Sequence, residues 1–183
     1  MHAPPLRALL LLTLLLPAAW LAGPLAAQDV TNNNRQLERQ VDRPGQTGLP
    51  LPRFVSLRAS EVNLRAGPGI RYPIQWVYQR RNMPVEVIEE FETWRRIRDW
   101  EGTDGWVHQS MIQGRRSILV TGQERLLLRE PEGGSAPVAK LEAGVVGELL
   151  GCNGRWCEVA AGGFDGWLPR EAFYGTYPDE TLE

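Results

Sequence analysis

Few side chains in this sequence could act as a nucleophile or as a base near neutral pH. Beyond residue 27 there is one histidine, His108, and the chain has two cysteines, Cys152 and Cys157. A cysteine–histidine hydrolase would need one of these thiols as a thiolate beside His108. The same three residues fall short of the four ligands of a structural zinc site. We therefore expect no catalytic residue, no metal site and no cofactor, and we interpret His108 as an exposed residue at a strand end.

Carboxylates lie close together in two places, at residues 89–92 and 99–101. Two carboxylates flanking a cleft could act as acid and base in sugar hydrolysis. The same charges are equally suited to hairpin loops, where they keep the edges of a sheet soluble. A domain of about 60 residues offers little depth for a cleft, so we favour the second interpretation. The protein is expected not to be an enzyme.

Aromatic and arginine side chains point instead to ligand binding. Aromatic rings edged by arginine bind extended peptides, because the guanidinium groups pair with carboxylates. Tyr72, Trp76 and Tyr78 are separated by even steps, so on one strand they would share one face. Arg80 and Arg81 follow them directly. The predicted ligand-binding residues are Arg71, Tyr72, Trp76, Tyr78, Arg80, Arg81 and Trp100; the alternative is that this aromatic stripe packs against the second half of the chain.

The first 27 residues have the pattern of a secretory signal peptide. Arg7 precedes an apolar run, and small residues lead up to Ala27. An uncleaved anchor is the alternative, because residues 8–27 are long enough to span a bilayer. We expect export to the periplasm, an oxidising space where a disulfide persists. Residues 28–52 contain no aromatic side chain and no sustained period, and are predicted to be a flexible linker.

From residue 53 onward the sequence repeats itself, over 53–113 and again over 116–175, with an acidic tail at 176–183. The motif Leu64-Arg65 aligns with Leu128-Arg129 at an offset of about 64, and Asp104-Gly105-Trp106 aligns with Asp165-Gly166-Trp167 at about 61. The first offset pairs Trp76 with Lys140 and Tyr78 with Glu142, which suggests that the scaffold does not require aromatic side chains at these two positions.

Each repeat shows strand-like alternation and glycine-rich turns, which predict a small all-β barrel or sandwich. Cys152 and Cys157 enclose four residues with an Asn153-Gly154 turn signal. If these four residues form the hairpin loop, the cysteines face each other at disulfide distance. A two-residue turn at Asn153-Gly154 would stagger them instead. We predict the disulfide.

These motifs resemble those of bacterial SH3-like (SH3b) domains. The run Leu64-Arg65-Ala66-Gly67-Pro68-Gly69, then Trp94-x-x-Ile97 and Gly105-Trp106-Val107, is similar to that family in order and spacing. The second repeat keeps the order but has Glu130-Pro131-Glu132-Gly133-Gly134 at the first loop. The resemblance implies two tandem SH3-like barrels, and a binding or targeting role in the cell envelope of Gram-negative bacteria, often toward peptidoglycan.

We therefore expect a secreted, periplasmic binding module for cell-wall peptide or glycan. The alternatives are a structural adaptor for an envelope protein partner and, least favoured, a cell-wall hydrolase. A formal net charge of −2 argues against a nucleic-acid partner held by bulk attraction to phosphates.

Overall fold

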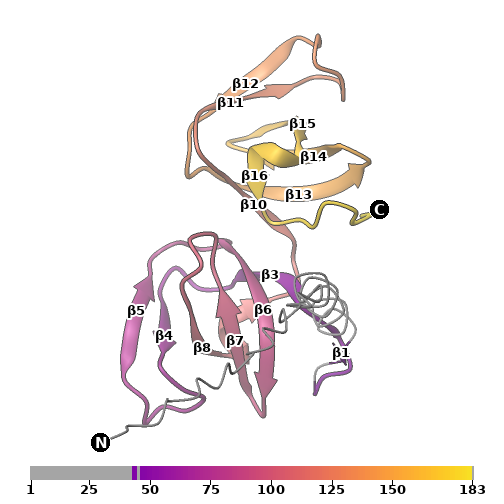
Figure 1. Cartoon of the computed structure of the whole chain (residues 1–183). Helices are drawn as coiled ribbons and strands as arrows, with labels where there is room; N and C mark the ends of the chain where they lie inside the picture. Colours follow the sequence, from indigo (N-terminus) through magenta and orange to yellow (C-terminus); the bar gives the residue numbers. More distant parts are fainter. Residues whose placement is uncertain (1–42, 45, 183) are drawn as a thin grey trace, which may run out of the picture. The chain divides into compact units, whose positions relative to one another are not determined.

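A computed structural model describes residues 43–44 and 46–182 of the 183-residue chain. These residues form an all-β protein with two seven-stranded antiparallel sheets, one for each sequence repeat, as the alternating patterns predict (Figure 1). The predicted signal peptide and the first part of the predicted linker lie outside the described residues. No helix in the described part of the chain is both long enough and apolar enough to cross a membrane.

The first repeat forms a seven-stranded sheet in the order β5-β4-β8-β7-β6-β3-β9. Its strands are β3 (Arg53–Leu57), β4 (Val62–Arg65), β5 (Ile74–Tyr78), β6 (Pro84–Phe91), β7 (Trp94–Arg98), β8 (Asp104–His108) and β9 (Ile112–Gln113), with a single 3-10 turn, η1 (Gln109–Met111), before β9. Two short strands, β1 (Arg43–Pro44) and β2 (Pro50–Leu51), pair with each other ahead of this sheet.

The second repeat has the same strand order, β12-β11-β15-β14-β13-β10-β16. Its strands are β10 (Ser117–Val120), β11 (Arg125–Leu128), β12 (Pro137–Leu141), β13 (Val146–Asn153), β14 (Trp156–Ala161), β15 (Phe164–Pro169) and β16 (Phe173–Tyr174), with the 3-10 turn η2 (Arg170–Ala172) before β16. Each strand of one repeat therefore has a counterpart in the other, which confirms the tandem organisation.

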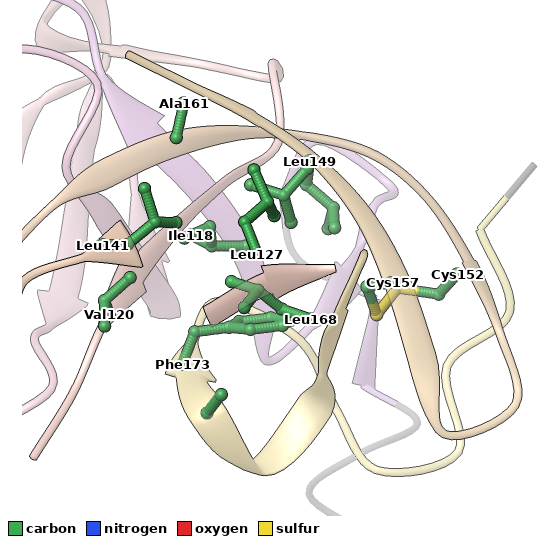
Figure 2. Packing of buried hydrophobic residues seen from close by; sticks show 12 residues of the cluster. Ile118, Val120, Leu127, Leu141, Leu149, Cys152, Cys157, Ala161, Leu168 and Phe173 are labelled. Carbon is green, nitrogen blue, oxygen red and sulfur yellow. A yellow bond between two sulfur atoms is a disulfide. The ribbon is translucent and has the colours of Figure 1, made fainter. Parts of the chain in front are cut away.

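Each repeat buries its own aliphatic core. In the first repeat, Leu57, Leu64 and Ile97 are fully buried, and in the second repeat Ile118, Leu127 and Leu168 are fully buried. Figure 2 shows the second of these cores, in which Cys152 and Cys157 lie beside the leucines. Burial of inward-facing side chains from successive strands accounts for the period-2 patterns in the sequence.

Strand register corrects the sequence alignment of the first hairpin by one residue. Leu64 pairs with Trp76 in the first repeat, and in the second repeat Leu127 pairs with Ala139. The offset is therefore 63 at this hairpin rather than 64. The predicted pairing of Trp76 with Lys140, and of Tyr78 with Glu142, is wrong. The true counterparts are Ala139 and Leu141, and Leu141 is buried as Tyr78 is.

The predicted disulfide is present, but its turn is shorter than expected. Cys152 and Cys157 are directly opposed on β13 and β14, with Cα atoms 4.0 Å apart. Asn153 still pairs with Trp156, so only Gly154 and Arg155 form the turn. Gly154 adopts φ 58°, a left-handed conformation that glycine adopts without strain. Because the turn is centred one residue further along than Asn153-Gly154, the cysteines are not staggered.

The first repeat has a buried ion pair where the second has this disulfide. On β6 and β7, Glu90 pairs with Arg95, the position that Cys152 and Cys157 hold on β13 and β14. The Arg95 Nε lies 3.4 Å from a Glu90 carboxylate oxygen, and both side chains are almost completely buried. Each repeat therefore links the same hairpin with a different chemistry.

The Gly-Trp motif that occurs in both repeats reflects a close approach between strands. A Cβ on Gly105 would lie 2.7 Å from the Leu64 Cγ and 2.9 Å from the Arg65 carbonyl oxygen. On Gly166 it would lie 2.6 Å from the Leu128 carbonyl oxygen. Only glycine allows β4 to pair with β8, and β11 with β15, at these distances.

The end of the predicted linker is bound to the first repeat. The Thr47 backbone N–H and hydroxyl both donate to the Glu90 carboxylate, at 2.8 and 2.9 Å. Arg53 donates to the same carboxylate at 2.6 Å, and Leu51 packs against the core. The folded part of the chain therefore extends several residues ahead of the predicted boundary at residue 53.

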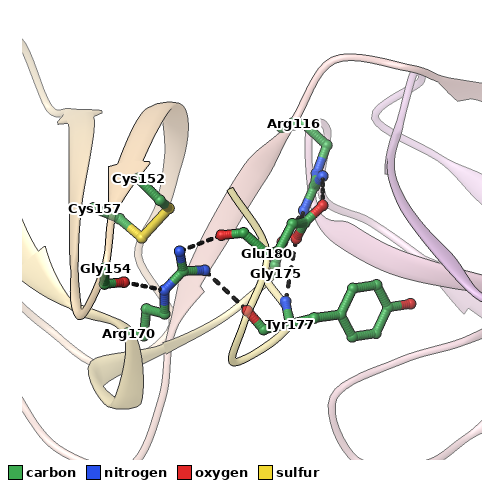
Figure 3. The surroundings of a disulfide bond; sticks show 8 residues. All are labelled: Arg116, Cys152, Gly154, Cys157, Arg170, Gly175, Tyr177 and Glu180. Atoms are coloured by element: carbon green, nitrogen blue, oxygen red, sulfur yellow. Dashed lines mark hydrogen bonds and ion pairs between the residues drawn. A yellow bond between two sulfur atoms is a disulfide. The ribbon is translucent and has the colours of Figure 1, made fainter. Parts of the chain in front are cut away.

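Residues 176–182, predicted as an acidic tail, also pack against the folded chain. Glu180 forms an ion pair with Arg116 at 2.5 Å (Figure 3). Leu182 forms an isolated antiparallel β-bridge with Cys152. Burial alone would raise the pKa of Glu180, but the hydrogen bonds from Arg116 and from the Tyr177 backbone, together with the positive charges of Arg116 and Arg170, hold that pKa below its ordinary value. The Tyr177 hydroxyl donates to Glu86 of the first repeat at 2.7 Å.

Aromatic contacts join the two repeats at a place that the sequence did not suggest. The Phe54 ring lies 4.7 Å from the Tyr177 ring and 5.0 Å from the Tyr174 ring, measured between centroids. The hydroxyl groups of Ser56 and Ser117 are hydrogen bonded at 2.6 Å. Trp76, expected to lie in such a contact under the alternative interpretation, is 56% exposed.

Candidate functional site

The seven predicted ligand-binding residues do not share one environment in the structure: one is buried in the core, two lie in a loop, and the others are exposed elsewhere. Tyr78 is only 4% exposed, and its hydroxyl donates to Asp99 at 2.9 Å. Burial, and then the Asp99 carboxylate, raise the pKa of Tyr78 far above its ordinary value, so the phenol stays protonated. Tyr78 shares a face of β5 with Trp76, as the even spacing requires, but its ring belongs to the core.

Arg71 and Tyr72 come together in the loop between β4 and β5. The Arg71 guanidinium carbon lies 5.3 Å from the centre of the Tyr72 ring, a cation–π contact. A Cβ on Gly67 would lie 2.5 Å from that ring, so glycine is required there. Arg65 donates to the carbonyl oxygens of Ile70 and Tyr72 at 3.1 and 2.8 Å. These contacts give the loop a defined shape that presents Arg71 at the surface.

The remaining predicted residues are exposed and are not brought into one cluster. Trp76 lies on β5 and Trp100 in the turn between β7 and β8, and both are exposed. Arg81 is exposed as well, whereas Arg80 donates a hydrogen bond to the Gly144 carbonyl oxygen of the second repeat. The assignment of these residues to ligand binding stays a prediction.

A groove of about 590 Å³ opens beside the β4–β5 loop of the first repeat. Residues 68–71 of that loop and residues 91–94, which form the β6–β7 turn, line it together with His108. Ile70 is 83% exposed and Phe91 is 44% exposed at its rim. The Trp94 and His108 rings meet edge to face, with centroids 5.5 Å apart and planes at 82°. The groove therefore combines apolar and aromatic surface with the cationic Arg71 and the anionic Glu92.

Buried groups hold the second wall of the groove in place. Arg95 donates to the carbonyl oxygens of Glu92 and Trp94, both at 2.8 Å, and to the Gln109 side chain at 2.9 Å. Its guanidinium also pairs with Glu90. The β6–β7 turn is thus tied to the start of η1, so that wall has a fixed conformation before any ligand binds.

The histidine at the groove caps the 3-10 turn η1. The Ser110 backbone N–H donates to His108 Nδ1 at 3.3 Å, and the Ser110 hydroxyl lies 2.8 Å from the same nitrogen. Nδ1 therefore acts as an acceptor, and a neutral His108 carries its proton on Nε2. Both cysteines are in the disulfide. Within the described ranges no group of three or more histidine, cysteine or acidic side chains could hold a metal ion.

The structure places Arg71 in the β4–β5 loop, beside Ile70 and across the groove from Phe91, two residues that the sequence analysis did not identify. One signal was present: Phe91 pairs with Trp94, and the counterpart pair in the second repeat is Asn153 with Trp156. An aromatic residue at position 91 is therefore not needed by the hairpin. Trp94 has the counterpart Trp156 in the second repeat, and its half-buried ring also lines the groove.

The strand order and the groove define a tandem pair of small antiparallel β-barrels with an open surface on the first. The chain belongs to the bacterial SH3 domain family, whose model matches residues 58–114 and again 122–175. This confirms the resemblance seen in the motifs. Bacterial SH3 domains are often cell-wall binding modules.

Comparison with solved structures finds several distantly similar chains, two of them from Trichomonas vaginalis. No curated protein matches the chain. NlpC1 from Trichomonas vaginalis is 13% identical, with a TM-score of 0.32, over 68% of this chain and 46% of that one. NlpC2 from the same organism is 12% identical, with a TM-score of 0.33, over 70% of this chain and 50% of that one. The chain spans about half the length of these two structures.

Proposed function

We propose that the protein is a non-catalytic, periplasmic binding module that recognises the peptide or glycan of peptidoglycan through the groove of its first repeat. The observation that carries the proposal is the groove itself, where exposed Ile70 and Phe91 lie with Arg71 around the Trp94 ring. The family to which the chain belongs supports a cell-wall ligand.

The groove suits this ligand chemically. The peptides of peptidoglycan carry carboxylates, which arginine binds by charge-assisted hydrogen bonds. Sugar rings and small aliphatic side chains present apolar faces that pack on aromatic rings. Arg71 stands beside Phe91 and Trp94 in the lining of the groove, so one ligand could use both kinds of contact. The second repeat has a different first loop and Asn153 at the position of Phe91, so we assign binding to the first repeat.

The groove also favours binding over hydrolysis. Its histidine caps η1 through Nδ1, and the thiols that a cysteine–histidine hydrolase would use are bonded to each other. Glu90, one of the clustered carboxylates, accepts a hydrogen bond from Thr47 and forms ion pairs with Arg53 and Arg95. His108, the two cysteines and Glu90 thus have structural partners.

Co-sedimentation of the purified protein with isolated peptidoglycan sacculi tests this proposal. We compare the wild type with Phe91→Asn, which installs the residue of the second repeat at the groove rim. Phe164→Asn is the matched control, since Phe164 is an exposed aromatic residue on the second repeat. We expect the wild type and Phe164→Asn to sediment equally and Phe91→Asn to bind at least about tenfold more weakly, a loss of about 1.4 kcal/mol.

Two results would contradict the proposal. One is sedimentation of the wild type no greater than that of an unrelated secreted protein. The other is equal retention of Phe91→Asn and the wild type, which would move binding away from the groove. Unfolding midpoints of both variants close to that of the wild type would show that a loss reflects the groove and not the fold.

A further inference from the structure

Strand β5 ends the sheet of the first repeat and exposes apolar side chains. It is the terminal strand in the order β5-β4-β8-β7-β6-β3-β9, with β4 as its single hydrogen-bonded neighbour among the described residues. Ile74, Trp76 and Val77 are all exposed, Trp76 to 56%. Alternate N–H and C=O groups of such an edge face away from the sheet and can pair with another strand.

The corresponding strand of the second repeat has no large apolar side chain at the same three positions, and two of them hold proline and lysine. Register places Pro137, Ala139 and Lys140 of β12 where β5 has Ile74, Trp76 and Val77. Lys140 pairs with Glu124 at 2.9 Å. Proline and lysine are the residues with which proteins block unwanted pairing at sheet edges. The fold therefore does not require an apolar edge here, and the first repeat keeps one that the second repeat lacks.

The charges around β5 indicate what could cover it. Residues 71–81 contain Arg71, Arg80 and Arg81 and no acidic side chain. Arg71 and Arg81 are exposed at opposite ends of the strand, and neither is in an ion pair within the described part of the chain. A segment with apolar side chains for the edge and acidic side chains near its ends would complement this surface.

We propose that the edge of β5 binds an extended, acidic polypeptide segment of a partner protein as an added β-strand. Main-chain hydrogen bonds would hold the segment, and its side chains would contact Ile74, Trp76 and Val77. This is a second binding surface beside the groove at Phe91 and Trp94, and the two surfaces share Arg71.

A second copy of the chain is a poorer occupant for this edge. Antiparallel pairing of two β5 strands centred on Trp76 places Arg71 of one copy opposite Arg81 of the other. Like charges directly opposed across strands are destabilising. An acidic segment would instead be attracted to Arg71 and Arg81.

The test uses the purified protein and defined peptide probes. The binding probe is a fluorescein-labelled decapeptide of alternating valine and glutamate. One control peptide replaces glutamate with lysine, and another places proline at alternate positions so that it cannot pair as a strand. The edge variant Trp76→Ala/Val77→Lys copies the second repeat, and Phe91→Asn serves as the control variant because it alters only the groove.

We expect the acidic peptide to bind the wild type and Phe91→Asn equally, and to bind the edge variant at least tenfold more weakly. Binding should weaken with added salt and should slow amide hydrogen exchange in residues 74–78. The edge variant should still sediment with sacculi, so failure of this proposal and failure of the groove proposal are distinguishable.

Several outcomes would overturn the proposal. They are no detectable binding of the acidic peptide at millimolar concentration, equal binding of the lysine or proline peptide, or equal binding by an edge variant whose unfolding midpoint matches the wild type. A dimer in analytical ultracentrifugation that the edge variant dissolves would assign the edge to self-association instead.

Discussion

Replacing Glu90 by glutamine removes one buried negative charge and nearly preserves the shape of the side chain. The Glu90 side chain is 1% exposed, and its carboxylate accepts hydrogen bonds from Thr47 and Arg53 and pairs with Arg95. Removing one partner of a buried ion pair costs about 3–5 kcal/mol, because the other charge stays buried without compensation.

Two features of this site place the expected cost at the lower end of that range. Arg95 retains its hydrogen bonds to Glu92, Trp94 and Gln109, and Arg53 is near enough to the surface to reach water. The amide of glutamine also keeps one acceptor oxygen. We expect Glu90→Gln to lower the free energy of unfolding by about 2–4 kcal/mol. At about 2–4 °C per kcal/mol, the melting temperature should fall by roughly 5–15 °C.

Guanidinium and thermal unfolding of the wild type, Glu90→Gln and Glu89→Gln measure this effect. Glu89 is the matched control, because it lies next along β6 and its pairing with Arg96 is exposed, at 3.5 Å. Exposed pairs contribute about 0–1 kcal/mol. Equal and small losses in both variants would refute the reasoning, since they would show that the buried carboxylate stabilises the hairpin no more than an exposed one does.

At low pH, the difference in the free energy of unfolding between the wild type and Glu90→Gln should disappear. Burial would raise the pKa of Glu90, but hydrogen bonds from Thr47 and Arg53 outweigh burial and hold that pKa below its ordinary value. The stabilisation is therefore complete above the unfolded-state pKa of about 4.3 and is lost as the pH falls through the lower folded-state pKa. A gap between the two proteins that stays constant from pH 7 to pH 3 would contradict this assignment.

Three further changes have defined expectations. Glu90→Cys/Arg95→Cys should form a disulfide, since the register equals that of the natural one; two free thiols by titration would contradict the equivalence. Gly105→Ala should lower the free energy of unfolding by about 1–3 kcal/mol by pushing on Leu64 and the β4 backbone, whereas Gly114→Ala, with open space around it, should change it little in denaturant titration. Tyr177→Phe, which removes the hydrogen bond to a carboxylate of the first repeat, should cost about 1–2 kcal/mol in the same titration; no change would mean that this bond is offset by solvation.

The fold could be predicted because the same pattern of strands and turns occurs in both sequence repeats. Strand alternation, the Gly-Trp motif and the Cys152–Cys157 spacing each depend on local geometry or on nearest strand neighbours. The register of the first hairpin could not be fixed in the same way, because Leu126, Leu127 and Leu128 are consecutive and alternation does not choose among them. In the structure Leu127 is the buried one, which shifts the alignment by a residue.

The candidate site was only partly predictable, because it forms where distant segments meet. The groove joins the loop at 68–71 to the turn at 91–94, which are about twenty residues apart, and no periodicity brings them together. Arg71 was named from the sequence only as an arginine that flanks the aromatic stripe. Tyr78 was expected at the surface because β5 alternates, yet it is buried where the end of β5 meets Asp99.

The shared position of Glu90–Arg95 and Cys152–Cys157 gives the two repeats different requirements for maturation. Closing the Cys152–Cys157 bond releases two electrons and two protons, so it needs an electron acceptor. The Glu90–Arg95 contact forms without any transfer of electrons, as soon as its hairpin folds. The first repeat therefore reaches its final structure without an oxidant. In the second repeat, the disulfide is present only in chains that have been oxidised. The first repeat can serve as an internal reference when the redox history of the second is followed.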